Sequence, residues 1–333
     1  MIESASLGFL ILVIVIAMAF EFANGFNDAA NAIATVVSTR VLSPLAAVAM
    51  AAVMNFVGAI SGTAVAKAVA KGVVDPDGIT QTVVAGGVAA AALWVFLASR
   101  WGMPVSGSHS LIAGVAGAGV AQGGFGLLQG PGLTRILEGL VLSPIFGFFL
   151  AYVVMLTIYW TLKSMAPTMI TTIFSKAQIF TAGWMAFSHG SNDAQKTMGI
   201  ITLALFTHGS IDALEVPFWV IVLSGSVMAA GTYFGGFRVI RTLGVRIVKM
   251  RPIHGFAAEG AAAGVITIAS RMGIPISTTH TITSAILGMG STRRISAVRW
   301  GVARSIVYAW VLTFPICGVL GAVLYYLADL VVA

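Results

Sequence analysis

The chain has 333 residues, of which 58% are hydrophobic and only 9% are charged, against about 25% charged residues in soluble proteins. This composition excludes a large soluble domain. Apolar segments of about 20 residues follow one another with short polar breaks, which is the pattern of an all-α polytopic membrane protein. We therefore expect a multi-pass protein in the lipid bilayer of the plasma (inner) membrane.

Much of the positive charge lies in two segments. Residues 238–254 carry five Lys or Arg residues, residues 293–304 carry four, and neither segment contains an acid. The positive-inside rule places both segments in the cytoplasm. Nucleic-acid binding is not expected, because basic loops of this kind are common beside membrane spans.

The first half begins with an apolar run at residues 7–20, which no basic segment precedes, so we expect an uncleaved first helix. That helix leads into the motif G25-F-N-D-A-A-N-A32. Full-length apolar segments follow at 44–66 and 80–100. The stretch R100-W-G-M-P-V-S-G-S-H-S110 then introduces a short piece, 106–122, and a long helix at 134–161 closes the half.

The second half repeats this order. G190-S-N-D-A-Q-K-T197 echoes the first motif, and R271-M-G-I-P-I-S-T-T-H-T281 echoes the second. Full segments lie at 214–238, 256–272 and 303–331, with a short piece at 277–290. The chain is thus a duplication, with one transmembrane repeat at 1–165 and another at 166–333. The two short pieces suit re-entrant or broken helices.

The charges of equivalent loops predict how the repeats are oriented. The loop after 44–66 is neutral, because Lys67 and Lys71 are balanced by Asp75 and Asp77, whereas its counterpart after 214–238 is strongly basic. Equivalent loops of such unequal charge belong on opposite faces of the membrane. This predicts inverted-topology repeats, as in many secondary transporters; a parallel duplication remains the alternative.

The Asn-Asp motif places Asp28 and Asp193 in apolar surroundings. A carboxylate there is costly unless it is paired or lines a wet cavity, which marks a functional site by default; capping a helix end is the structural alternative. With Asn27, Asn192 and backbone carbonyls freed at Gly25 or Gly190, the carboxylates form a hard-oxygen set suited to Na⁺.

The second motif is typical of an anion site. Ser106, Gly107 and Ser108, with their echo Ser277, Thr278 and Thr279, follow a proline and open a short helix. Hydroxyls and free N–H groups at a helix N-terminus bind oxyanions, while ordinary N-capping is the structural alternative. His109 and His280 follow the triplets and either donate to the ligand or brace the loop.

One position separates the two halves chemically. Asn31 follows Asn27 by four residues and would share its helix face, but the equivalent residue of the second half is Lys196. We expect Asn31 to contribute to phosphate binding, and Lys196 to partner either an anion or Asp193. A carboxylate accepts but does not donate, so the motifs favour an oxyanion that still carries a proton, such as phosphate, over sulfate.

These residues resemble the PiT family of inorganic phosphate transporters over nearly the whole chain. The resemblance implies ion-coupled phosphate uptake through inverted repeats, with Na⁺ or H⁺ as the coupling ion. Three departures stand out. Asn55 occupies a place where many relatives carry Glu, the acid Glu259 has Val88 as its repeat equivalent, and Glu21 has Ala186. Glu21 and Glu259 are therefore candidate supporting residues only, and Glu259 could equally bond backbone at a helix start.

Taken together, the sequence predicts a Na⁺-coupled symporter of inorganic phosphate working by alternating access. The phosphate is expected on the Ser/Thr triplets with Asn31 and Lys196, and Na⁺, the co-transported ion, on Asn27, Asp28, Asn192 and Asp193. A H⁺-coupled phosphate or metal-phosphate symporter, a sulfate permease, a channel and a phosphate sensor are the alternatives. No enzyme activity and no cofactor is expected, since no Walker-type loop or metalloprotease motif occurs in the sequence. A homodimer stays open.

Overall fold

The computed structural model describes residues 6–235 and 237–332. Within this part of the chain all regular structure is helical, apart from one isolated bridge between Val74 and Leu128. The first half contains α1 (Leu7–Ser38), α2 (Pro44–Ala59), α3 (Ala64–Gly72), α4 (Gln81–Trp101), α5 (Gly107–Gly123), η1 (Phe125–Leu127) and α6 (Gly130–Thr161). The second contains α7 (Pro167–Thr207), α8 (Phe218–Phe234), α9 (Phe237–Arg241), η2 (Thr242–Arg246), α10 (Pro252–Arg271), α11 (Thr278–Ser291), η3 (Ile295–Ala297) and α12 (Trp300–Val332).

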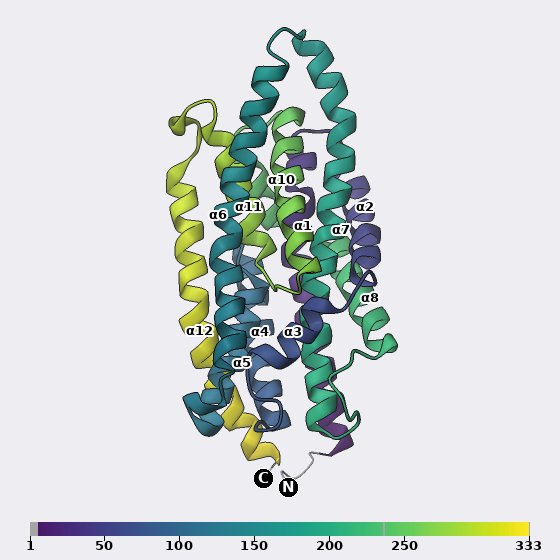
Figure 1. Ribbon diagram of the computed structural model, residues 1–333, viewed down its shortest axis with the longest axis vertical. Coiled ribbons are helices and arrows are strands. Elements are labelled where there is room, and N and C mark those ends of the chain that lie inside the picture. Colours follow the sequence, from purple (N-terminus) through teal and green to yellow (C-terminus); the bar gives the residue numbers. More distant parts are fainter. Residues whose placement is uncertain (1–5, 236, 333) are drawn as a thin grey trace.

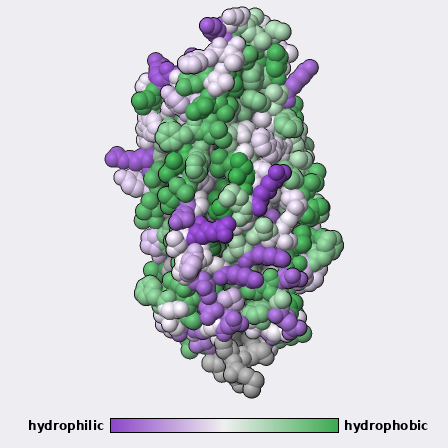
Figure 2. Space-filling model, in the orientation of Figure 1, coloured by the Kyte–Doolittle hydropathy of each residue, from purple (hydrophilic) through white to green (hydrophobic). Residues whose placement is uncertain are grey.

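Five of these helices, α1, α4, α6, α10 and α12, are long and apolar enough to cross a membrane, and the bent pairs raise this to as many as seven in the described part of the chain. The predicted all-α polytopic fold is therefore confirmed. Exposed apolar side chains cover the outer helices, among them Phe146 and Phe149 on α6 and Val311 and Val319 on α12. Figure 2 shows such side chains over much of one face of the molecule, as contact with lipid requires.

The structure corrects two segment boundaries. The expected full segment 44–66 is divided into α2 and α3, which meet at a 70° bend. The small polar residues Ser61, Gly62 and Thr63 lie at this break. The expected segment 214–238 is likewise shorter, because α8 ends at Phe234 and the chain then bends by 62°. The short pieces at 106–122 and 277–290 match α5 and α11, which at about 1.5 Å per residue are shorter than the hydrocarbon core of a bilayer is thick.

Equivalent helices of the two halves run in opposite directions. In Figure 1, α1 and α6 rise from the end where both termini lie, whereas α7 and α12 descend towards it. The contacts exchange between the halves in the same way: α1 packs on α8 as α7 packs on α2, and α6 packs on α11 as α12 packs on α5. This arrangement fits inverted repeats. The division at 165/166 lies in the turn between α6 and α7 and stays a prediction.

Candidate functional site

Both Asn-Asp motifs lie in the middle of continuous helices. Gly25 is inside α1 and Gly190 is inside α7, so the carbonyls that were expected to be freed there remain part of regular helices. The glycines instead allow close helix packing. A Cβ atom on Gly25 would lie 2.5 Å from the Met228 carbonyl oxygen of α8. One on Gly190 would lie 2.1 Å from the backbone carbonyl oxygen of Asn55 in α2. The motif helices are thereby held tightly against their neighbours.

The two acids meet at the centre of the molecule. Asp28 and Asp193 are 1% and 2% exposed, and their carboxylates approach the same imidazole, His189. The His189 Nε2 atom lies 3.6 Å from Asp28 Oδ2 and 3.4 Å from Asp193 Oδ2. One potential ligand atom from each of these three residues lies within 4.8 Å of the others. The duplicated acids therefore form one site rather than two distant ones.

His189 was missed by sequence reasoning. It stands directly before Gly190 and four residues before Asp193, and its repeat equivalent is Asn24, so the i, i+4 spacing is the signal that could have found it. The Asn55 amide donates to Thr232 Oγ1, which turns the Asn55 oxygen towards His189 Nδ1 at 3.0 Å. When Nδ1 carries the hydrogen and donates it to the Asn55 oxygen, Nε2 is left as an acceptor. Nε2 and the two carboxylates are then three hydrogen-bond acceptors that face one another.

The two short helices α5 and α11 meet at this centre with their N-termini. Ser106 and Ser277 cap them, accepting from the N–H groups of His109 and His280 at 3.2 Å. The first two residues of each helix are Gly107 and Ser108 in α5 and Thr278 and Thr279 in α11. Their backbone N–H groups donate to no acceptor within the described residues. Four first-turn donors are thus available, the arrangement that binds anions at helix ends.

His109 and His280 join the two helix ends to each other. Their rings lie 4.3 Å apart, and the His280 ring stacks on Trp310 at 3.7 Å. The His109 Nδ1 atom is 2.7 Å from Ser106 Oγ, so this ring also holds its own capping residue. Both imidazoles are buried. These contacts match the bracing alternative for the two histidines.

A hydroxyl in the first turn of each short helix also contacts a carbonyl oxygen of the other half. The Thr279 hydroxyl lies 3.3 Å from the Val105 carbonyl oxygen and 3.1 Å from Asp28 Oδ1. Asn31 donates its amide to the same hydroxyl at 3.0 Å, and to Thr278 at 3.4 Å. A carboxylate, a carbonyl and a hydroxyl oxygen therefore gather beside Asn31. Such hard oxygens are the ligands of alkali and alkaline-earth cations.

The second half builds the same cluster from equivalent residues. The Ser108 hydroxyl donates to the Ile276 carbonyl oxygen at 2.9 Å. Here the Lys196 ammonium lies among the oxygens, 2.5 Å from Asp193 Oδ1, 2.5 Å from Ser108 Oγ and 2.6 Å from the Ile276 oxygen. Thr278 donates to the other Asp193 oxygen at 2.9 Å. Of the two sequence-based expectations for Lys196, the structure shows the pairing with Asp193.

The motif asparagines are themselves engaged in side-chain hydrogen bonds. Asn27 donates its amide to Asp28 Oδ1 and to the Val105 oxygen, both at 3.1 Å, while its own oxygen accepts from Ser99. Asn192 donates to Ser270, the equivalent serine, at 2.9 Å. In this arrangement Asn27 is hydrogen-bonded to two oxygens of the first-half cluster and Asn192 to a serine, and their role as Na⁺ ligands stays a prediction. The serines on α4 and α10 had no sequence signal beyond their repeat spacing.

Glu21 and Glu259 lie on opposite sides of this centre. Glu21 is seven residues before Asp28 on α1, and Glu259 of α10 contacts α1 seven residues after Asp28, at Thr35. Glu21 accepts from Thr197 of α7, and Glu259 accepts from Thr35 of α1 and from Thr181 at 2.7 Å. Glu259 stands in the middle of α10, so the idea that it bonds backbone at a helix start is wrong. Both fully buried acids connect helices through side-chain hydroxyls.

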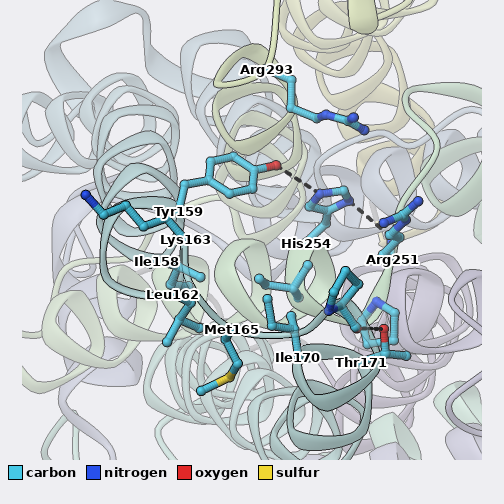
Figure 3. A pocket seen from close by; sticks show the side chains of 13 residues that line it. Ile158, Tyr159, Leu162, Lys163, Met165, Ile170, Thr171, Arg251, His254 and Arg293 are labelled. Carbon is cyan, nitrogen blue, oxygen red and sulfur yellow. Dashed lines mark hydrogen bonds between the residues drawn. The ribbon is translucent and has the colours of Figure 1, made fainter.

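A cavity of about 320 Å³ lies apart from the motif residues, near the turn between α6 and α7 (Figure 3). Tyr159, Lys163, Arg251, His254 and Arg293 line it, and the Tyr159 hydroxyl lies 3.2 Å from His254 Nε2. The Arg299 N–H donates to the Ile247 oxygen at 3.0 Å. The two basic segments therefore meet at one end of the molecule.

Comparisons with known proteins agree with this geometry. A model of the Phosphate transporter family matches residues 24–321. A "probable low-affinity inorganic phosphate transporter" of Rhizobium meliloti is 44% identical, covering 98% of this chain and 99% of the relative. One of the same description from Bacillus subtilis is 41% identical, covering 96% and 97%. A solved structure described as "the sodium-dependent phosphate transporter" superposes with a TM-score of 0.88 at 25% identity, covering 97% and 100% of the two chains.

Proposed function

The chain belongs to the Phosphate transporter family, and from this premise we propose that it is a Na⁺-coupled symporter of inorganic phosphate that works by alternating access. The family resemblance seen in the sequence is confirmed, and with it phosphate transport by an integral membrane protein that is not an enzyme. The coupling ion, the roles of single residues and the sidedness are the proposal.

One observation carries the proposal: a hard-oxygen cluster adjoins four free helix N–H groups. The Thr279 hydroxyl lies 3.1 Å from the Asp28 carboxylate and 3.3 Å from the Val105 carbonyl oxygen. A Na⁺ bound among them would sit beside the first turns of α5 and α11. It would offset the charge of a phosphate held by the N–H groups there. Cation and anion would then stabilise each other, which is the physical basis of coupling.

The proposed phosphate site consists of the first turns of the two short helices α5 and α11. Gly107 and Ser108 supply N–H groups from one half, and Thr278 and Thr279 supply them from the other. Ser106 and Ser277 act indirectly, since their hydroxyls already cap the helices. A Cβ on Gly107 would lie 1.9 Å from the Asn24 side-chain oxygen, so a larger residue at this turn would have to displace the Asn24 amide.

We also propose the orientation of the protein. The end at which residues 238–254 and 293–304 meet would face the cytoplasm by the positive-inside rule. The opposite end holds α3 and the loop that follows it, where Lys67 and Lys71 of the helix balance Asp75 and Asp77 of the loop. Lys67 also lies 4.0 Å from Glu215. Single cysteines introduced at each end of the protein and labelled in intact cells would test this orientation.

Uptake of radiolabelled phosphate into proteoliposomes tests the coupling ion. An inward Na⁺ gradient should drive phosphate accumulation that collapses when Na⁺ is replaced by K⁺ or choline. An imposed pH gradient without Na⁺ should drive none. Uptake driven by protons and indifferent to Na⁺ would overturn the sodium assignment while leaving phosphate transport intact. Sulfate in excess should compete poorly.

A specific observation favours protons as the second candidate. His189 Nε2 faces two carboxylates, and a nitrogen ligand suits a proton better than a hard cation such as Na⁺. Under this alternative the third acceptor at the centre takes a proton with each phosphate. The same two gradients decide between the candidates, because only the proton mechanism responds to pH alone.

A further inference from the structure

Lys196 occupies the place that a bound cation would take in the second half. Its Nζ atom contacts Asp193 Oδ1, Ser108 Oγ and the Ile276 oxygen within 2.6 Å. The equivalent atoms of the first half are Asp28 Oδ1, Thr279 Oγ1 and the Val105 oxygen, which are the atoms assigned above to Na⁺.

The correspondence holds atom by atom. Residues 28 and 193, like 31 and 196, are separated by the 165 positions of the first motif pair, and residues 105 and 276, like 108 and 279, by the 171 of the second. Each cluster takes its carboxylate and carbonyl from one half and its hydroxyl from the other. The only change of chemical class is at one position, where the first half has the neutral amide of Asn31 and the second has the ammonium of Lys196.

A free cation and this ammonium exclude each other. Lys196 is 2% exposed and its side chain is enclosed by the oxygens it contacts. A second positive charge at the same three oxygens would lie within van der Waals contact of Nζ. A buried ammonium that left these oxygens would lose its compensating carboxylate, so it stays in place.

We propose that Lys196 is a built-in cation that fills the second cation site, so that this chain couples phosphate to a single exchangeable cation, held at Asp28 in the first half. The identity of that cation as Na⁺ rests on the proposed function. The number of exchangeable cation sites does not, because it follows from the occupied cluster.

The proposal has a thermodynamic consequence. Each coupled Na⁺ multiplies the attainable phosphate accumulation by the Na⁺ concentration ratio across the membrane. At the same Na⁺ concentration ratio, a protein with one tethered and one exchangeable cation therefore accumulates less phosphate than a protein with two exchangeable cations. In return, it needs a lower Na⁺ concentration to load its site.

The variant Lys196→Asn tests the proposal, because it gives the second half the residue type of the first. In proteoliposomes with a tenfold Na⁺ gradient and the voltage clamped at zero, its phosphate accumulation limit should exceed that of the unmodified protein by about tenfold. Its uptake should depend on Na⁺ more steeply. Lys176→Asn, the same exchange at an exposed position of α7, should change neither quantity. Unchanged Na⁺ steepness in a folded Lys196→Asn protein would overturn the proposal.

A direct count on the unmodified protein covers the case in which Lys196→Asn does not fold. Equilibrium dialysis of the purified protein with ²²Na⁺ and phosphate should show one bound Na⁺ per chain, and two would overturn the proposal. Failure of sodium coupling itself is distinguishable. It would show as unmodified protein that binds no Na⁺ and ignores Na⁺ gradients. A Na⁺ dependence newly created by Lys196→Asn would then still support the built-in cation, and its absence would refute it.

Discussion

The first and second halves of the central site have equivalent oxygens, but only the second half has an ammonium among them. In the second half Asp193 is paired with Lys196 at 2.5 Å, whereas in the first half Asp28 has the amide of Asn27 at 3.1 Å and the His189 ring at 3.6 Å. A duplicated backbone has thus been kept while one side chain changed the charge balance. The comparison teaches that equivalent acids have different partners: Asp193 is paired with a buried lysine, whereas Asp28 has no lysine beside it and is the acid to which we assign the exchangeable cation.

The largest effect that separates the two acids is expected in stability. Asp193→Asn leaves the Lys196 ammonium buried without its counter-charge, which costs about 3–5 kcal/mol. Asp28→Asn removes no such partner and should leave the melting temperature of the detergent-solubilised protein much closer to normal. Both variants should lose phosphate uptake by at least about 100-fold, since each carboxylate adjoins the ion site. Thermal unfolding and uptake are to be measured on the same preparations.

A double variant serves as the control for this difference. Asp193→Asn combined with Lys196→Met removes both charges and should recover most of the lost stability but none of the uptake. If Asp28→Asn were as destabilising as Asp193→Asn, the assignment of different duties to the two acids would have to be abandoned.

The next effect concerns the glycines that hold the motif helices in place. Gly190→Ala would bring a Cβ to 2.1 Å from the backbone carbonyl oxygen of Asn55, and Gly25→Ala would bring one to 2.5 Å from that of Met228. Both contacts are with backbone that has little room to move, so we expect a destabilisation of about 1–3 kcal/mol or more in each half. Gly301→Ala, where a Cβ would meet nothing within 4 Å, is the matched control. Equal melting temperatures for all three variants would contradict the packing argument.

The fold was predictable where hydropathy and repeat spacing act together. The long outer helices α6 and α12 expose apolar side chains and each contain a strongly apolar stretch of 18 residues, so their existence follows from composition. The division of α2 from α3 did not follow, because three small polar residues look like a brief interruption until the 70° bend is seen. The central helix α7 escapes a simple hydropathy test for a physical reason: its polar residues face other helices rather than lipid.

The candidate site was predictable in its residues but not in their pairing. The duplicated motifs indicated Asp28, Asp193 and the Ser/Thr triplets, and the structure brings these together. The place of the Val105 oxygen beside Thr279 depends on how α11 crosses between the halves, and the approach of His189 to Asp28 depends on the packing of α7 against α1. No local pattern encodes either arrangement. The orientation of the Asn27 amide was also beyond the sequence, since it is fixed by Ser99 on α4.

A smaller effect should distinguish the two crossing hydroxyls. Thr279→Val removes the hydroxyl oxygen from the first-half cluster at nearly constant volume, so the Na⁺ concentration for half-maximal uptake should rise about tenfold, the equivalent of about 1.4 kcal/mol. Ser108→Ala removes the matching hydroxyl next to Lys196, where no mobile cation is expected. It should lower the rate of uptake without shifting the Na⁺ dependence. Shifts of equal size in both variants would indicate two mobile cations.

The smallest expected effect lies one layer further out, at the serines that orient the asparagines. Ser99→Ala removes a hydrogen bond of 3.1 Å to the Asn27 oxygen, and Ser270→Ala removes one of 2.9 Å from the Asn192 amide. A single hydrogen bond of this kind contributes about 0.5–1.5 kcal/mol. Because Asn27 positions two ligands of the mobile cation, Ser99→Ala should weaken the apparent Na⁺ affinity by a few-fold. Ser270→Ala acts beside a cluster that Lys196 already fills, so it should lower stability and leave the Na⁺ dependence unchanged. Na⁺ titrations of phosphate uptake for the two alanine variants therefore test whether the two halves also differ in the residues that support each cluster. An equal loss of Na⁺ affinity in both variants would show that Lys196 does not cause the difference between the halves.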